Sequence, residues 1–329
     1  MALSDSHSLI KNIIILGGGT AGWLTANHLA KKLCTGSPLA PTVTLIESKD
    51  IPTVGVGEGT VPAIRDSLRY LGISETTLVR ECDVTFKQSI KFVDWVEGPG
   101  DIDNYYYHLF DYPRGEGVNL TPYWLMGHAA SESYANSVSI QGRVCDLGLG
   151  PKSLTQPEYE GLTNYAYHLD AAKFGKLLAT HAINEFGVNY REANIVDAEI
   201  DGNGGITKLV TDDHQFIEGD FFIDCSGFSS ALLGKKLGVP FIDKDDILFV
   251  DRALALQVPY PAVNDAIPCY TIATAKSAGW IWDIGLTSRR GTGYVYSSRH
   301  IDDESAAEEY KQYLGIDFRE SEPRKINMS

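Results

Sequence analysis

The sequence has few cysteines and no pattern among them that indicates a metal site or a disulfide framework. Its five cysteines are far apart in the 329 residues, and no C-x-x-C pair occurs. Zinc sites and disulfide-rich domains need closely spaced cysteines, so we expect reduced thiols in a cytoplasmic protein and no bound metal. No apolar run is long enough to span a membrane, and the first residues lack the apolar core of a signal peptide.

Positive charge is also scarce. The chain has 28 Lys and Arg against 43 Asp and Glu, a formal net charge of −15. Nucleic acids and anionic membranes are bound by clustered basic residues, so we expect neither as a partner. With 43% hydrophobic and 22% charged residues, the composition is typical of a folded chain that forms one large domain or two ordinary ones.

The start of the chain carries the most informative pattern. Residues 13–16 are a short apolar run that predicts a buried strand, and helix-forming residues follow at 21–33. Between them lies Gly17-x-Gly19-x-x-Gly22. In a dinucleotide-binding turn the first glycine allows a tight turn, the second lets the backbone approach a pyrophosphate, and the third lets helix and strand pack closely.

An acidic residue supports this interpretation. The next predicted strand, 42–47, ends on Glu47, where an acid would hold ribose hydroxyls. Such a glycine turn is a weak signal alone, but the strand, helix and acid in order favour nucleotide binding over a chance turn. A glycine-rich loop at 48–62 is expected to run close to a ligand, and an apolar strand ending in a glycine turn at 221–227 is expected at the same site.

The remaining patterns predict an α/β fold. The expected helices cover 63–82, 170–186 and 303–314, and the expected strands cover 83–95, 194–200, 206–211 and much of 247–299. Residues 98–165 are rich in aromatics, glycine and proline and predict no regular structure. Together these elements indicate a Rossmann-type sheet interrupted by an antiparallel β-rich region, an arrangement common in flavoproteins.

Several separate motifs then agree on one family. Six stretches carry the agreement: Gly17-Gly-Gly-Thr-Ala-Gly-Trp23, Gly55-Val-Gly-Glu-Gly-Thr-Val-Pro62, Phe86-Lys87 with Ile90-Lys-Phe-x-x-Trp95, Tyr107-His108-Leu-Phe110, Phe222-Ile-Asp-Cys-Ser-Gly227 and Gly279-Trp-Ile-Trp-Asp-Ile-Gly285. On these motifs, over nearly its whole length, the chain resembles the flavin-dependent tryptophan halogenases. In that family reduced FAD, O2 and a halide such as chloride or bromide generate hypohalous acid, which is delivered to an electron-rich aromatic substrate.

The resemblance implies roles for individual residues. Lys87 would deliver the halogen, either by hydrogen-bonding hypohalous acid or as a haloamine. His108 and Phe110 would sandwich the aromatic substrate, and Trp280 and Trp282 would separate it from the flavin. The residues expected to bind FAD are Gly17, Gly19, Thr20, Ala21, Gly22, Glu47, Ser48, Val54, Val56, Gly59 and Val196. A separate flavin reductase would supply reduced FAD, and a homodimer is compatible with the resemblance.

The resemblance also implies a domain organisation. We expect residues 1–97 and 165–240 to form a discontinuous FAD-binding core, and residues 98–164 and 241–329 to form the β-rich region that covers the substrate. Lys91 is expected on the same strand face as Lys87 and reads as an ordinary lysine. His168 and Asp170 read as structural, since no G-x-S-x-G nucleophile motif accompanies them.

Three departures from the family pattern stand out. Gly285 replaces the usual proline, Gly59 replaces the usual alanine, and residues 128–160 match nothing familiar. Gly285 and the unfamiliar stretch suggest a roomier, less tryptophan-specific site. The family's C-terminal helical part, with its second catalytic acid and halide-binding segment, is not found in the sequence.

Three alternatives stay open. A flavin-dependent monooxygenase that hydroxylates its substrate would share most motifs, although the two tryptophans and Lys87 argue against it. An NAD-dependent dehydrogenase would have no role for the glycine-rich loop or for the tryptophans. A truncated, non-catalytic FAD-binding fragment would explain the missing C-terminal segment.

Overall fold

The chain divides into two compact units. The computed structural model describes residues 9–51, 55, 57–96, 104–113, 115, 117–129, 131–260, 266–316 and 322–328. The first unit consists of Met1–Val54 and Ala171–Ile242, and the second of Gly55–Asp170 and Asp243–Ser329. The predicted boundaries differ at residues 55–97, which group with the second unit because their strands pair there. The assignment of cofactor and substrate roles to these regions stays a prediction.

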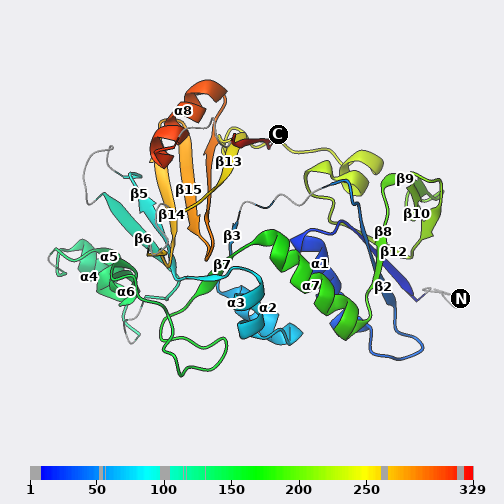
Figure 1. Ribbon diagram of the computed structural model, residues 1–329, viewed down its shortest axis with the longest axis horizontal. Helices are drawn as coiled ribbons and strands as arrows, with labels where there is room; N and C mark the ends of the chain where they lie inside the picture. Colours follow the sequence, from blue (N-terminus) through cyan, green and yellow to red (C-terminus); the bar gives the residue numbers. More distant parts are fainter. Residues whose placement is uncertain are drawn as a thin grey trace, which may run out of the picture. The chain divides into compact units, whose positions relative to one another are not determined.

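The first unit is built on a four-stranded parallel sheet in the order β12-β1-β2-β8. These strands are Phe221–Asp224, Asn12–Leu16, Thr42–Glu47 and Asn189–Glu192. Helices α1 (Thr20–Leu33) and α7 (Ala171–Phe186) pack side by side (Figure 1). The buried Asn27 amide ties them together by donating to the Leu178 carbonyl at 2.9 Å. The predicted Rossmann-type sheet is confirmed.

A small antiparallel sheet completes the first unit. Its order is β11-β10-β9, from Phe216–Glu218, Ile206–Thr211 and Ile195–Ile200. A short 3-10 turn at Gly227–Ser229 and a π-helical turn at Ala231–Lys236 follow β12. One apolar cluster joins both sheets to this turn; its buried members are Ile14, Leu16, Ile46, Ala198, Leu209, Ile217 and Leu232.

The second unit contains a seven-stranded sheet in the order β17-β13-β16-β15-β14-β5-β6. In that order the strands are Arg324–Asn327, Arg252–Val258, Arg290–Tyr296, Gly279–Gly285, Thr271–Lys276, Ser89–Val93 and Tyr105–Leu109. All neighbours are antiparallel except β14 and β5. The predicted antiparallel β-rich region is thus confirmed, and 247–299 supplies four of its strands.

Helix α8 (Asp303–Leu314) covers one face of this sheet beside β16 (Figure 1). Asp302 caps its start by accepting from the Ser305 amide at 2.7 Å, and Gly315 ends it in the left-handed region. Tyr310 is buried under the helix, with its hydroxyl 2.6 Å from that of Thr292 on β16. The helix predicted at 303–314 is confirmed.

A three-stranded sheet, β3-β7-β4, lies in the same unit. Its strands are Glu58–Gly59, Ala166–Leu169 and Thr85–Lys87. The single strand expected over 83–95 is therefore two strands, β4 and β5, which belong to different sheets and are separated at Gln88. The prediction that Lys91 shares a strand face with Lys87 is wrong, because this break separates their strands.

The segments around these sheets include several short helices. The predicted helix pair at 63–82 is α2 (Ala63–Leu71) and α3 (Glu75–Glu81), separated by Gly72 in the left-handed region. Residues 98–165, where no regular structure was expected, contain β6 and the helices α4 (Thr121–Leu125), α5 (Tyr134–Val138) and α6 (Gln141–Asp146). These helices are about one turn long, which is too short for a helical periodicity to be detected in the sequence.

The glycine turn between β1 and α1 is sterically required. Gly17 has φ +118°, and a Cβ there would clash with the Cys225 carbonyl. A Cβ at Gly22 would clash with the Gly17 carbonyl oxygen, so this glycine lets the helix approach the strand. A Cβ at Gly19 would meet nothing within 4 Å. Gly17 and Gly22 are therefore required by close packing, whereas Gly19 leaves open space.

We predict that Gly22→Ala and Gly19→Ala differ sharply in stability. Gly22→Ala should lower the free energy of unfolding by about 1–3 kcal/mol, because backbone atoms must move to admit the methyl group. Gly19→Ala should change it by less than about 1 kcal/mol, since its extended backbone suits alanine. Urea unfolding of both variants beside wild type measures this, and equal losses would contradict the assigned roles.

Candidate active site

The turn between β1 and α1 of the first unit contains a buried hydroxyl that makes no hydrogen bond within the described residues. Gly19 precedes α1, and no side chain caps the helix there. The hydroxyl oxygen of Thr20 is buried and, among the described residues, has no hydrogen-bond partner. A helix N-terminus with uncapped amides attracts anions. The turn formed by Gly17, Gly19, Thr20, Ala21 and Gly22 therefore fits a phosphate or pyrophosphate group.

Glu47 ends β2 beside this turn. Its carboxyl group lies against Gly18, where a Cβ would collide with it. Burial raises the pKa of the Glu47 carboxyl, and a hydrogen bond from Tyr190 opposes that shift. A cavity of about 290 Å³ lies here, lined by Gly18, Trp23, Glu47, Ala172, Gly175, Lys176, Ala179, Ile183 and Tyr190. An acid at this position can accept hydrogen bonds from ribose hydroxyls.

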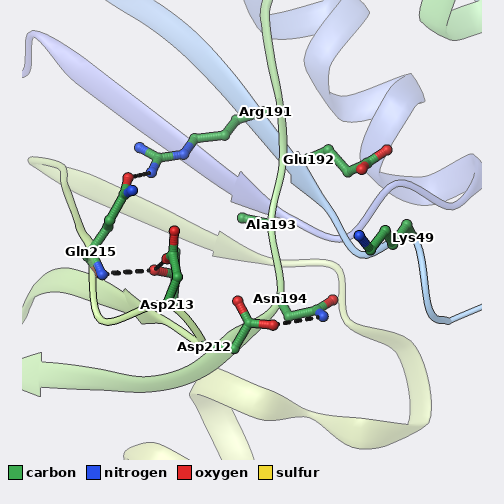
Figure 2. A pocket seen from close by; sticks show the side chains of 9 residues that line it. Lys49, Arg191, Glu192, Ala193, Asn194, Asp212, Asp213 and Gln215 are labelled. Atoms are coloured by element: carbon green, nitrogen blue, oxygen red, sulfur yellow. Dashed lines mark hydrogen bonds between the residues drawn. The ribbon is translucent and has the colours of Figure 1, made fainter.

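Ser48 lies beside a second cavity that the sequence did not reveal. Its hydroxyl donates to the Asn194 side-chain oxygen at 2.5 Å. The cavity, about 350 Å³, is lined by Lys49, Arg191, Glu192, Ala193, Asn194, Thr211, Asp212, Asp213 and Gln215. Figure 2 shows Asn194 turned toward Asp212 and Arg191 toward Gln215, at 3.0 and 2.9 Å. The lining carries charges of both signs: Lys49 and Arg191 are positive, and Glu192, Asp212 and Asp213 are negative.

Four other predicted cofactor residues have different outcomes. Val196 lies on β9 with 61% of its surface exposed, so it is open to a backbone or apolar contact. Val54 and Val56 lie outside the described residues. Gly59 lies on β3 in the second unit, directly opposite His168 on β7.

Lys87 ends β4 and is only 5% exposed. Strand β7 pairs with both β3 and β4, which brings Gly59 and Lys87 to the same strand from opposite sides. A Cβ on Gly59 would stand 3.0 Å from the lysine Nζ and 3.5 Å from Cδ2 of His168. The absent side chain therefore leaves the space that the lysine amine occupies.

The amine of Lys87 is buried among the described residues. In the described part of the chain, no carboxylate forms an ion pair with Lys87, and its Nζ lies 5.4 Å from the ring centre of Phe110. Burial lowers the pKa of Lys87 from its usual value to about 8. A fraction of the amine is therefore uncharged near neutral pH, unlike a surface lysine.

The structure brings Phe110 to Lys87. The Phe110 amide donates to the Gln88 carbonyl at 3.1 Å and to the Gln141 side-chain oxygen at 2.8 Å, so two contacts fix the start of this loop. His108 is exposed on β6, two residues earlier, where it pairs with Ile90. Strand β6 ends at Leu109 and Phe110 follows in a bend, so side-chain alternation along the strand does not place His108 and Phe110 on one side. Their joint contact with an aromatic ring stays a prediction.

Trp280 and Trp282 lie on β15 with their ring centres 6.4 Å apart, edge to face. Trp282 rests on Gly293 of the neighbouring strand, where a side chain would collide with the indole. Trp280 also contacts Trp95, at 6.4 Å between ring centres. Both tryptophans are half-buried, so they form a packed but accessible aromatic surface.

This aromatic surface extends across strands that the sequence did not connect. Trp282 is opposite Ala273, Ala273 is opposite Phe92, and Phe92 is opposite Tyr106. The Phe92 and Tyr106 rings stack at 5.1 Å. Strand order and register create the row, and neither can be read from the separate motifs.

Gly285 does not open additional room at its own position. A Cβ there would stand 2.7 Å from Ile267 and 2.9 Å from the Tyr260 hydroxyl. Neighbouring side chains fill the space, so the expectation of a roomier site is wrong at Gly285. Its carbonyl oxygen accepts a hydrogen bond from the Thr85 hydroxyl at 2.5 Å, two residues before Lys87.

Lys91 lies in different surroundings from Lys87. Its Nζ is 3.6 Å from the ring centre of Tyr105, and Asp146 lies nearby, accepting from the Tyr107 hydroxyl at 2.8 Å. Burial lowers the pKa of Lys91, while Asp146 opposes the shift. A cavity of about 750 Å³ lies at this tyrosine cluster, lined also by Trp124 and other residues of the α4–α5 region.

Metal-binding clusters and membrane-spanning helices are two further features that bear on function. Within the described ranges, no group of three or more His, Cys, Asp or Glu side chains could hold a metal ion. Over the same residues, no helix is both long and apolar enough to cross a membrane.

The sequence of the chain is similar to those of known tryptophan halogenases. A family model described as tryptophan halogenase matches residues 12–329. The tryptophan 6-halogenase of Streptomyces toxytricini is 36% identical over 338 residues, covering 96% of this chain and 63% of that protein. The tryptophan 7-halogenase of Lentzea aerocolonigenes is 34% identical, covering 94% and 59%. The chain thus spans less than two thirds of the length of these relatives.

Comparison with solved structures also finds halogenases. A tryptophan halogenase from Shewanella frigidimarina NCIMB 400 superposes with a TM-score of 0.92 at 44% identity, covering 98% of this chain and 63% of that one. A flavin-dependent halogenase from Xanthomonas campestris superposes with a TM-score of 0.84 at 35% identity, covering 97% and 62%.

The buried amine predicts a pH-dependent effect on stability. Since the pKa of Lys87 lies below its ordinary value of 10.5, the unfolded chain binds more protons between about pH 8 and 10.5, and the wild type gains stability as the pH rises through that window. Lys87→Met should therefore be more stable than wild type at pH 7, by up to about 3 kcal/mol, and the difference should shrink by pH 9.5. Urea unfolding at both pH values, with Lys235→Met at an exposed lysine as the control, tests this; a difference independent of pH would contradict it.

Proposed function

The chain belongs to the tryptophan halogenase family, and from this premise we propose that it is an FAD-dependent halogenase. Its substrate would be an electron-rich aromatic molecule, with tryptophan or another indole first. Bound reduced FAD would activate O2, the oxidant that converts chloride or bromide to hypohalous acid; one oxygen atom would enter the hypohalous acid, the other would leave as water, and the flavin would end oxidised. A separate flavin reductase would deliver the reduced flavin.

The single observation that carries this proposal is the buried amine of Lys87 beside Phe110. An ammonium group at this place can donate a hydrogen bond to hypohalous acid and increase its electrophilicity, and the uncharged fraction could form a haloamine instead. Few water molecules can compete, because the side chain is 5% exposed. His108 and Phe110 would hold the aromatic ring within reach of the amine.

The residues of the first unit suit FAD. The uncapped helix start and the buried Thr20 hydroxyl would bind the pyrophosphate, Gly19 would allow its close approach, and Glu47 would accept from ribose hydroxyls. We assign supporting contacts with the cofactor to the remaining predicted residues, Ser48, Val54, Val56, Gly59 and Val196.

Trp280 and Trp282 favour halogenation over hydroxylation. We assign to this pair the shielding of the organic substrate from the flavin, so that only the small oxidant reaches it. Their packing on Gly293 and against Trp95 supports a rigid wall. A monooxygenase needs its substrate next to the flavin and would not need such a wall.

The FAD assignment predicts a selective loss of affinity. Gly19→Ala and Thr20→Val should each weaken FAD binding by about tenfold or more. The methyl group added at Gly19 would obstruct the close approach of the pyrophosphate, and the hydroxyl lost at Thr20 would remove a hydrogen bond to a charged phosphate. Gly202→Ala is a matched control, since that glycine also has open space around it but lies in a distant turn. Fluorescence titration with FAD measures the affinities, and equal affinity in all three variants would rule out this site.

The halogenase assignment predicts a product with a halogen isotope pattern. The full-length protein, supplied with FAD, a flavin reductase, NADH, bromide and a panel of indoles and phenols, should give that product by mass spectrometry. Lys87→Ala should reduce its rate by about 100-fold or more, whereas Lys91→Ala should not. A gain of one oxygen would show hydroxylation, and no product with FAD bound would support the non-catalytic alternative.

A further inference from the structure

His168, interpreted as structural from the sequence, is a fully buried histidine. It is 0% exposed on β7, between the two strands that carry Gly59 and Lys87. Its Cδ2 and the lysine Nζ both border the space above Gly59, at 3.5 and 3.0 Å from where a Cβ would stand. The imidazole edge is thus one wall of the lysine's surroundings.

Two threonine hydroxyls define the protonation of this imidazole. The Thr85 hydroxyl donates to the Gly285 carbonyl at 2.5 Å, so toward Nδ1 of His168, 3.4 Å away, it can only accept. Nδ1 therefore carries the proton, and Nε2 accepts from the Thr271 hydroxyl at 2.8 Å. Both ring nitrogens are satisfied in a neutral tautomer.

The other charged groups near this site do not neutralise Lys87. Glu58 on β3 has its pKa raised by burial and by Asp170, and Asp170 is paired with Arg289 at 2.7 Å. Tyr167 on β7 donates to Glu75 at 2.6 Å, and His108 on β6 is exposed. Burial and the charge of Lys87 lower the pKa of His168 to about 3. His168 thus stays uncharged over the range in which Lys87 titrates.

We propose that His168 is a positioning residue for Lys87, held neutral by Thr271 and Thr85 so that it keeps both water and a second positive charge away from the lysine amine. The proposal deepens the proposed function, because it concerns the residue assigned to deliver the halogen. In this proposal Thr271, Thr85 and the Gly285 carbonyl together hold the imidazole in place. The contact between Thr85 and Gly285 also links β4, which ends at Lys87, to β15. A merely structural histidine would affect folding but not the titration of the lysine.

The test compares two replacements of His168. His168→Ala leaves a space that water can fill, so the ammonium is better solvated and the Lys87 midpoint should rise by about one pH unit. His168→Phe keeps an uncharged wall, so the midpoint should stay within about 0.3 unit of wild type. NMR titration of protein labelled with 13C at lysine Cε measures this, with the Lys87 signal assigned by Lys87→Arg and Lys91 as the internal reference.

A second pair leaves the histidine in place. Thr271→Val removes the hydroxyl that donates to Nε2, and the freed nitrogen becomes an acceptor beside the lysine, which should raise the Lys87 midpoint. Thr271→Ser retains the hydroxyl and should leave the Lys87 midpoint unchanged. In folded variants, an unchanged midpoint in both His168→Ala and Thr271→Val would overturn the proposal.

The titration needs no turnover, so it separates this proposal from the proposed function. If halogenation occurs, the pH profile of its rate should move with the Lys87 midpoint in His168→Ala and Thr271→Val. A moved midpoint without any halogenation would support the positioning role and contradict the halogenase assignment. Halogenation with an unchanged Lys87 midpoint would support the halogenase assignment and contradict the positioning role of His168.

Discussion

Burial of the Lys87 amine, with no ion pair to a carboxylate in the described part of the chain, is the constraint on which the site in the second unit depends. Lys87 is 5% exposed; the ring centre of Phe110 lies 5.4 Å from its Nζ, and the neutral His168 borders the same space above Gly59. Desolvating an amine in this way costs stability, and the cost appears as a lowered pKa. A fold tolerates such a cost where the chemistry of the group requires it, which is why this lysine, and not Lys91, is the focus of the site.

Three short strands make that burial feasible. Strand β7 holds β3 on one side and β4 on the other, so segments near residues 58, 87 and 168 converge although they are far apart in the chain. Gly59 leaves room for the amine, and the Gly285 carbonyl anchors Thr85 in β4. The two glycines that depart from the family pattern, Gly59 and Gly285, therefore both act on strands that carry or support this lysine. The aromatic surface of β15 belongs to the same unit.

Local patterns predicted the parts of this protein that depend on local rules. The turn at Gly17, Gly19 and Gly22, the acid at Glu47 and the helix at 303–314 follow from sterics and periodicity within a few residues. His168 was interpreted as structural because no nucleophile motif accompanies it. Its partners, Thr271 and Thr85, are distant in sequence, so no local pattern could reveal them. The break at Gln88 was missed because β4 and β5 join different sheets, which only long-range pairing decides. The aromatic row from Trp282 to Tyr106 likewise depends on strand order.

The proposed function requires an aromatic substrate to meet Lys87 at this buried place. A crystal structure of the full-length protein with a bound indole tests it most directly. The account predicts the ring between His108 and Phe110, with a ring carbon facing the lysine Nζ. An indole bound elsewhere, for example in the cavity beside Tyr105 and Tyr107, with the space before Lys87 closed, would contradict it.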